Sequence, residues 1–150
     1  MELVTFETAK LAKEKGFNLG CQDCFDASGS SYSYGWCERL DDFFKDQDFF
    51  NSEIEDLQFS EKYFTRPYQS QLQKWLREKH FIYVSVIPSY VGNDSKKRLY
   101  FELSFGSKIR QVTGSGYKET YEEALEEGLI QALKLIKKIN HNDNVENTYY

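Results

Sequence analysis

The spacing of apolar residues changes from a helical to a strand period within the stretch Gln69–Tyr90. Before His80, apolar side chains recur at spacings that place them on one face of a helix. After His80, apolar residues alternate as they do along a strand. The helical stripe consists of Tyr68, Leu72, Trp75 and Leu76, and one strand face consists of Ile82, Val84 and Val86. The pattern predicts a helix over Pro67–His80, with Pro67 in its first turn, followed by a strand over Phe81–Tyr90.

Two further strands are predicted from the same alternation. Pro88 places the first strand at a sheet edge or at a strand end, because proline has no main-chain N–H to donate. Arg98–Gly106 alternates cleanly and is typical of a half-buried antiparallel strand. Lys108–Thr113 is a weaker third strand. The apolar face of the middle strand consists of Leu99, Phe101, Leu103 and Phe105.

Helices are predicted at both ends of the chain. Tyr121–Ile139 has a continuous apolar face, and Thr120 and Glu123 form a capping box in front of it. Gly128 on this face indicates either a close approach to the sheet or a chance surface glycine. A first helix over Thr5–Lys15 has Thr5 as its cap, and residues 18–36 read as two short extended pieces around a turn. Trp75 and Leu76 are expected to form the centre of the core with Leu125, Leu129 and Leu133.

These elements predict one α+β domain. Its antiparallel sheet has three or more strands, two helices pack on one face in the order α-β-β-β-α over residues 67–139, and an N-terminal helix precedes them. Residues 1–65 form an acidic N-terminal part, and residues 140–150 form a flexible tail. A chain of 150 residues fits a single domain.

Composition places the protein in a cytoplasm. The chain has no run of 18 or more apolar residues, and its first 20 residues carry charges where a signal peptide needs apolar ones. Twelve Phe and eleven Tyr argue against disorder over most of the length. We expect no membrane association.

Charge is divided along the chain. Residues 1–65 carry a net charge of −8 and residues 66–139 carry +5. The second part has the element order of a double-stranded RNA-binding domain, and a basic edge could contact phosphates. The stretch Lys118–Glu123 contains three glutamates and one lysine, however, where such domains are basic. The candidate nucleic-acid-binding residues are Lys96, Lys97, Arg98, Lys108 and Arg110, although a solvated charged face is the favoured interpretation.

Three cysteines raise the question of a metal. Cys21 and Cys24 have the spacing of a zinc knuckle, and Cys37 could add a third thiolate. A closed zinc site needs four ligands, and neither His80 nor His141 is near in sequence. We therefore favour structural cysteines and expect no metal and no cofactor.

The sequence offers no catalytic constellation. It contains no phosphate-binding loop, HExxH motif or nucleophile elbow, and His80 at a helix end more readily contacts carbonyls than acts as a base. Aromatic pairs set among acidic residues suit a protein interface instead, although they could equally complete the core. The candidate partner-binding residues are Phe43, Phe44, Phe49 and Phe50.

Three blocks of the chain carry a family resemblance: ELVTFETAKLAKEKGF, RPYQSQLQKWLREKHFIYVSV and YEEALEEGLIQALKLI. In this order they resemble a set of small uncharacterised proteins of Bacteroides-type gut bacteria and their phages and prophages. The resemblance implies a phage or mobile-element setting and no particular activity. We expect a non-enzymatic binding or adaptor protein that acts on an unidentified protein partner. The alternative is nucleic-acid binding by the basic edge.

Overall fold

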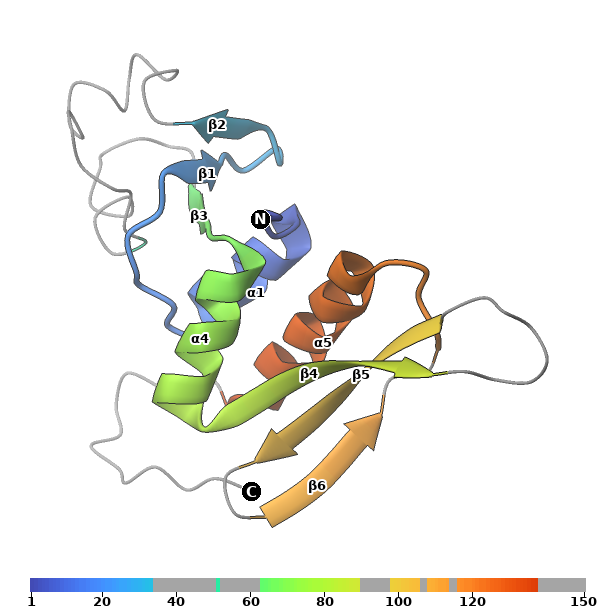
Figure 1. Ribbon diagram of the computed structural model, residues 1–150. Coiled ribbons are helices and arrows are strands. Elements are labelled where there is room, and N and C mark those ends of the chain that lie inside the picture. The colour runs from blue at the N-terminus through green and yellow to red at the C-terminus, as the bar shows by residue number, and fades with distance from the viewer. Residues whose placement is uncertain (34–50, 52–62, 90–97, 106–107, 114–115, 138–150) are drawn as a thin grey trace, which may run out of the picture.

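The computed structural model describes residues 1–33, 51, 63–89, 98–105, 108–113 and 116–137, and it confirms the α+β class (Figure 1). The α-β-β-β-α order predicted for the second half of the chain is present. The elements, in chain order, are α1 (Phe6–Glu14), β1 (Asp23–Phe25), β2 (Ser31–Ser33), β3 (Phe64–Arg66), α4 (Gln69–His80), β4 (Ile82–Ser89), β5 (Arg98–Phe105), β6 (Lys108–Thr113) and α5 (Tyr121–Leu135).

The larger sheet has the antiparallel order β4-β5-β6. Strands β4 and β5 pair over eight residues, from Ile82 opposite Phe105 to Ser89 opposite Arg98. Their alternation confirms the predicted faces, because Val84 and Phe101 are buried whereas Tyr83 is 42% exposed. Helices α4 and α5 lie on one side of this sheet (Figure 1).

Helix α5 approaches the sheet closely at Gly128. A Cβ atom at this position would lie 2.6 Å from Cγ1 of Val84 and 3.1 Å from Cβ of Phe101. Glycine therefore permits this packing distance. Of the two alternatives that the sequence left open for Gly128, the structure shows a close approach to the sheet and not a chance surface glycine. The predicted capping box of Thr120 and Glu123 is present at the start of the helix.

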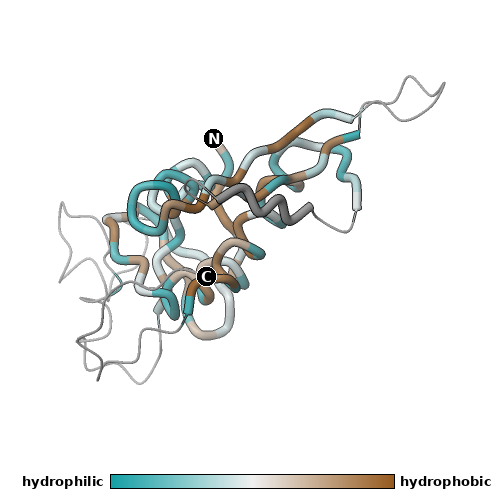
Figure 2. Tube along the Cα trace, turned by 90° about the horizontal axis from the view of Figure 1, so that it is seen from below, coloured by the Kyte–Doolittle hydropathy of each residue, from teal (hydrophilic) through white to brown (hydrophobic). Residues whose placement is uncertain are grey.

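One hydrophobic core joins the helices to the sheet, and it contains the five residues predicted for its centre. The ring of Trp75 meets that of Phe17 edge-on, with 5.4 Å between centroids. Figure 2 shows hydrophobic and hydrophilic stretches alternating along the trace, as expected where elements bury one face. The most buried members include Phe17, Leu72, Leu76, Phe101, Leu103, Leu129 and Leu133.

The smaller sheet has the antiparallel order β2-β1-β3 and lies beside α1. Its first two strands form the predicted extended pieces around a turn. Asp26 organises this turn: its carboxylate accepts hydrogen bonds from the Ser28 hydroxyl at 2.6 Å and the Tyr32 hydroxyl at 2.8 Å, and from the N–H groups of Ser28 and Ser30. The Ser28 hydroxyl is the main cause that lowers the pKa of Asp26, against the opposing effect of burial.

Two helix boundaries differ from the prediction. Helix α4 begins at Gln69 and not at Pro67, because the Pro67 carbonyl accepts a hydrogen bond from the Val4 N–H at 3.0 Å and Tyr68 pairs with Leu3. Those contacts hold residues 67 and 68 in an extended conformation. Helix α5 ends at Leu135, because Ile136 turns extended (ψ 123°) and buries its side chain. The predicted end at Ile139 lies outside the described residues.

The joint between α4 and β4 is built on an unusual residue. Phe81 caps the helix in the left-handed region (φ 54°), where glycine is usual, and its N–H donates to the Leu76 carbonyl. Beside this joint, Nε2 of Gln73 donates to the carbonyl of Val84 at 2.7 Å. The Gln73 side chain thereby satisfies a main-chain carbonyl of β4. Strand β4 lies at the edge of the described sheet, which is one of the two positions that Pro88 predicted.

No helix among the described residues is both long enough and apolar enough to cross a bilayer.

Candidate functional site

Helices α1 and α5 lie side by side and run in the same direction. The main-chain N–H of Thr5 donates to Oε1 of Glu126 at 2.8 Å, and Nζ of Lys15 donates to the carbonyl of Ile136. Both contacts join residues 121 positions apart in the sequence. The two helices therefore keep one register over ten residues, and their shared outer surface forms a groove.

The Glu126 carboxylate sits at the N-terminal end of α1. Its Oε1 also accepts from the hydroxyl of Thr8, and its Oε2 accepts from Nε2 of Gln69 at 2.8 Å. A carboxylate at this position satisfies N-terminal donors of α1 and complements the positive end of that helix's dipole. Glu126 is thus a structural tie between α1, α4 and α5.

Lys15 makes the complementary charged contact at the C-terminal ends of α1 and α5. The residue is buried, at 8% exposure, and its ammonium group meets a carbonyl at the C-terminal end of α5, where cations are favoured. Parallel neighbouring helices place like dipole ends together. Lys15 and Glu126 offset that repulsion with a positive charge at the carbonyl end and a negative charge at the N–H end.

The groove consists of two adjoining hollows that are open to solvent, of about 660 and 300 Å³. Glu7 and Lys134 line both hollows. Phe6, Leu11 and Ile130 supply apolar surface. The charged lining residues are Glu7, Glu14, Glu119, Glu123, Glu126 and Glu127, with Lys10, Lys118 and Lys134. Among the described lining residues, six carboxylates against three ammonium groups leave a net negative charge.

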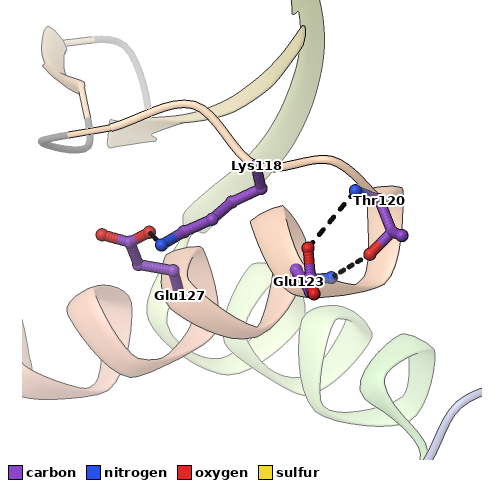
Figure 3. A network of polar contacts seen from close by, with 4 residues as sticks. All are labelled: Lys118, Thr120, Glu123 and Glu127. Carbon is purple, nitrogen blue, oxygen red and sulfur yellow. Dashed lines mark hydrogen bonds and ion pairs between the residues drawn. The ribbon is translucent and has the colours of Figure 1, made fainter.

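Part of this charge is used internally, as Figure 3 shows. Nζ of Lys118 lies 3.0 Å from Oε2 of Glu127, an ion pair in which this oxygen receives no well-aligned hydrogen bond. Oε2 of Glu123 accepts from the N–H of Thr120 at 3.4 Å, and the Thr120 hydroxyl accepts from the N–H of Glu123 at 3.2 Å. These contacts hold the N-terminal end of α5, which borders the groove.

Three other carboxylates of the groove make no such contacts with the described residues. Glu7, Glu14 and Glu119 are exposed, and their carboxylates make no hydrogen bond or ion pair with any other part of the chain that the structure describes. Exposed carboxylates around an apolar floor attract a ligand that carries both positive charge and apolar surface.

The structure describes only some of the candidate nucleic-acid-binding residues. Arg98 opens β5 opposite Ser89, whereas Lys108 pairs with Phe105 at the other end of the same strand. Seven residues of strand separate these ends by about 23 Å. Lys96 and Lys97 lie outside the described residues, and of Lys108 and Arg110 only the main chain is described. The described backbone thus separates Arg98 from Lys108 along β5.

Cys21 and Cys24 are both buried. Cys24 lies in β1 between Tyr32 and Thr65, and Sγ of Cys21 is 3.5 Å from the carbonyl of Leu19. Cys37 lies outside the described residues. Within the described ranges, no group of three or more His, Cys, Asp or Glu side chains is arranged to hold a metal ion.

The aromatic pairs Phe43-Phe44 and Phe49-Phe50 also fall outside the described residues. The next residue in the sequence, Asn51, is described and buried. Its Nδ2 donates to the carbonyl of Phe17 at 2.7 Å, and its Oδ1 accepts from the N–H of Thr65 at 2.9 Å. Sequence reasoning missed this residue, because one Asn in an acidic stretch carries no local signal of burial.

His80 packs its ring against Trp75 of the core, and no described carbonyl is recorded as its hydrogen-bond acceptor. Its ring meets that of Trp75 with 4.5 Å between centroids, and Nε2 is buried without a hydrogen-bond partner among the described residues. Burial, reinforced by the positive charge of Lys79, lowers the pKa of His80.

No protein-family model, curated protein or solved structure matches the chain in the three comparisons made.

Proposed function

We propose that this chain is a non-enzymatic binding protein, of the adaptor type, and that its groove between α1 and α5 takes a basic segment of a protein partner. The observation that supports this proposal most is the combination of an apolar floor with three carboxylates that form no ion pair or hydrogen bond with the described residues. Glu7, Glu14 and Glu119 stand around Phe6, Leu11 and Ile130.

The openness of the groove favours a macromolecular ligand. Sites for small molecules enclose most of their ligand, whereas this groove leaves one side to solvent. Its polar groups are spread along two helices and do not converge on one point. A partner segment can therefore bury apolar side chains on the floor while its charged side chains reach the rim.

The occupant that fits this chemistry is an amphipathic helix with lysines or arginines beside its apolar stripe. Such helices bind in grooves through residues spaced by three, four and seven positions. Helix α1 is nine residues long and extends about 14 Å, so a helical segment of about three turns is long enough to span it. Charge complementarity would speed encounter and would weaken with salt.

We place this activity in a phage or mobile-element setting within a bacterial cytoplasm. This placement rests on the resemblance of three sequence blocks to small proteins of Bacteroides-type bacteria and their phages. A binding protein without its own chemistry suits that setting, since it acts through the partner it holds.

Peptide titration tests the proposal. The probe is a fluorescein-labelled, 14-residue amphipathic Lys/Leu helix, and the comparison probe is a scrambled peptide of equal charge without an apolar face. Glu7→Lys/Glu119→Lys should weaken amphipathic binding at least tenfold. Glu78→Lys, which reverses one charge where the groove variant reverses two, is the control, because Glu78 is an exposed α4 glutamate outside the groove whose contact with Lys74 is long, at 3.9 Å.

Three outcomes of this titration would overturn the proposal. They are absence of binding at micromolar concentration, equal binding of both peptides, and equal loss in the Glu78→Lys control. A supporting result is preferential amphipathic binding that weakens as salt rises and is lost in the groove variant alone.

A further inference from the structure

The larger sheet leaves one face without a helix among the described elements. The opposite face is covered by α5, whose Gly128 touches Val84 and Phe101. Residues that alternate with these point to the uncovered side, and cross-strand pairing sets Ile87 of β4 beside Tyr100 of β5. Tyr83 lies on the same face and is 42% exposed. This side of the sheet therefore presents the exposed ring of Tyr83 and the part-exposed ring of Tyr100 to solvent.

The segment before α5 adds a third aromatic ring. Leu99 and Lys118 exchange main-chain hydrogen bonds at 3.0 and 2.6 Å, so residue 117 runs alongside β5. The ring of Tyr117 meets that of Tyr100 edge-on, with 6.1 Å between centroids, and remains 49% exposed. The guanidinium carbon of Arg98 lies 5.9 Å from the Tyr117 centroid. We call Tyr83, Ile87, Arg98, Tyr100 and Tyr117 the tyrosine face.

We propose that the tyrosine face binds single-stranded nucleic acid by base stacking. Exposed tyrosine rings on a sheet accept unpaired bases whatever the sequence, and an arginine beside them can stack on a base or bind a phosphate. The proposed site consists of the Tyr100–Tyr117 ring pair and the guanidinium group of Arg98. These side chains come from β5 and from the segment before α5 that pairs with it.

A duplex fits this face poorly. Its bases are stacked on one another, so the rings could reach only its backbone, where Arg98 is the one cation that the described part of this face supplies. Glu102 shares this side of the sheet and lies 3.4 Å from the Tyr100 hydroxyl, which adds a negative charge to the centre of the surface. Stacking tolerates that carboxylate better than close phosphate contact does, because the bases, and not the phosphates, approach the rings.

This inference is independent of the groove, because the two surfaces lie on different sides of the domain and share only Tyr117 at their border. A protein that held a basic partner in the groove and a single strand on the tyrosine face would join the two. Of the basic edge inferred from the sequence, Arg98 is the member whose side chain the structure describes, and it lies on the tyrosine face.

Fluorescence anisotropy of the full chain with labelled U12, dT12 and a 12-base-pair RNA duplex, at 50 and 200 mM salt, tests the inference. Single strands should bind more tightly than duplex, and binding should weaken with salt. Tyr117→Ala should reduce single-strand affinity by about tenfold, within the range known for loss of one stacked base. Arg98→Ala should reduce both the affinity and its salt dependence.

Tyr121→Ala provides the matched control. Tyr121 is as exposed as Tyr117, at 47% against 49%, and lies four residues later at the start of α5 outside the tyrosine face. Its removal should leave affinity unchanged. No binding of either single strand at micromolar protein, duplex binding equal to or tighter than single-strand binding, or an equal loss in Tyr121→Ala would each overturn the inference. Circular dichroism of each variant separates loss of binding from loss of fold.

Discussion

The ammonium group of Lys15 donates a hydrogen bond to the main-chain carbonyl of Ile136, and this contact joins the C-terminal ends of two parallel helices. Ten residues earlier on both helices, Thr5 meets Glu126 at the same sequence offset. A buried cation and a part-buried anion therefore mark the two ends of the α1–α5 pair. The groove proposed as the binding site depends on the register that these contacts set.

Replacing Lys15 by methionine should destabilise the fold by about 1–3 kcal/mol, because a carbonyl near the helix end loses a charged donor in a buried place. Urea denaturation followed by tryptophan fluorescence measures this change. Lys10→Met is the control, since Lys10 is exposed on α1 and should shift stability by no more than about 0.5 kcal/mol. Equal stability of the Lys15→Met variant and the parent would show that the contact does not hold the helix pair.

Gly128→Ala should also destabilise, by about 1–3 kcal/mol, even though alanine favours helix by ~1 kcal/mol over glycine. The added methyl would meet Val84 at 2.6 Å. In a Val84→Ala background the same substitution should cost less, because the clashing methyl is gone. Thermal or urea unfolding of the four proteins in this double-mutant cycle gives the coupling energy. Additive effects would contradict the close approach of α5 to the sheet.

His80 should make stability depend on pH. Because burial lowers its pKa, the unfolded chain binds a proton more readily than the folded protein does. The contribution of neutral His80 is fully present above the unfolded pKa of about 6.5 and is lost as pH falls toward the lower folded pKa. Unfolding free energies between pH 7.5 and 5.0 should therefore decline less steeply in His80→Gln than in the parent. Parallel curves for the two proteins would contradict this assignment.

Local signals predicted most of the fold. Alternation over Arg98–Phe105 and the apolar stripe of α4 appear as buried faces, and the Thr120–Glu123 box begins α5 as expected. The start of α4 was missed because Pro67 is engaged by Val4, a residue far away in sequence. Tertiary contacts of this kind override the local preference of proline for a first helical turn.

The candidate site was not predictable in the same way. The groove joins glutamates of α1 to those of α5, and no sequence pattern reports that helices more than a hundred residues apart run parallel. Lys15 and Glu126 look like ordinary surface charges in an amphipathic helix. The sequence candidates Phe43, Phe44, Phe49 and Phe50 lie outside the described residues and stay predictions, as does the role of Cys37.

The most direct test of the proposed function is a map of where the basic amphipathic peptide binds. Amide chemical shifts of the ¹⁵N-labelled chain should be recorded during titration with the unlabelled 14-residue Lys/Leu peptide. We expect the largest changes at Glu7, Leu11 and Ile130, with Tyr83 and Ile87 of the tyrosine face unchanged. Shifts centred on the tyrosine face, or no shifts at saturating peptide, would contradict the assignment of the α1–α5 groove as the partner site.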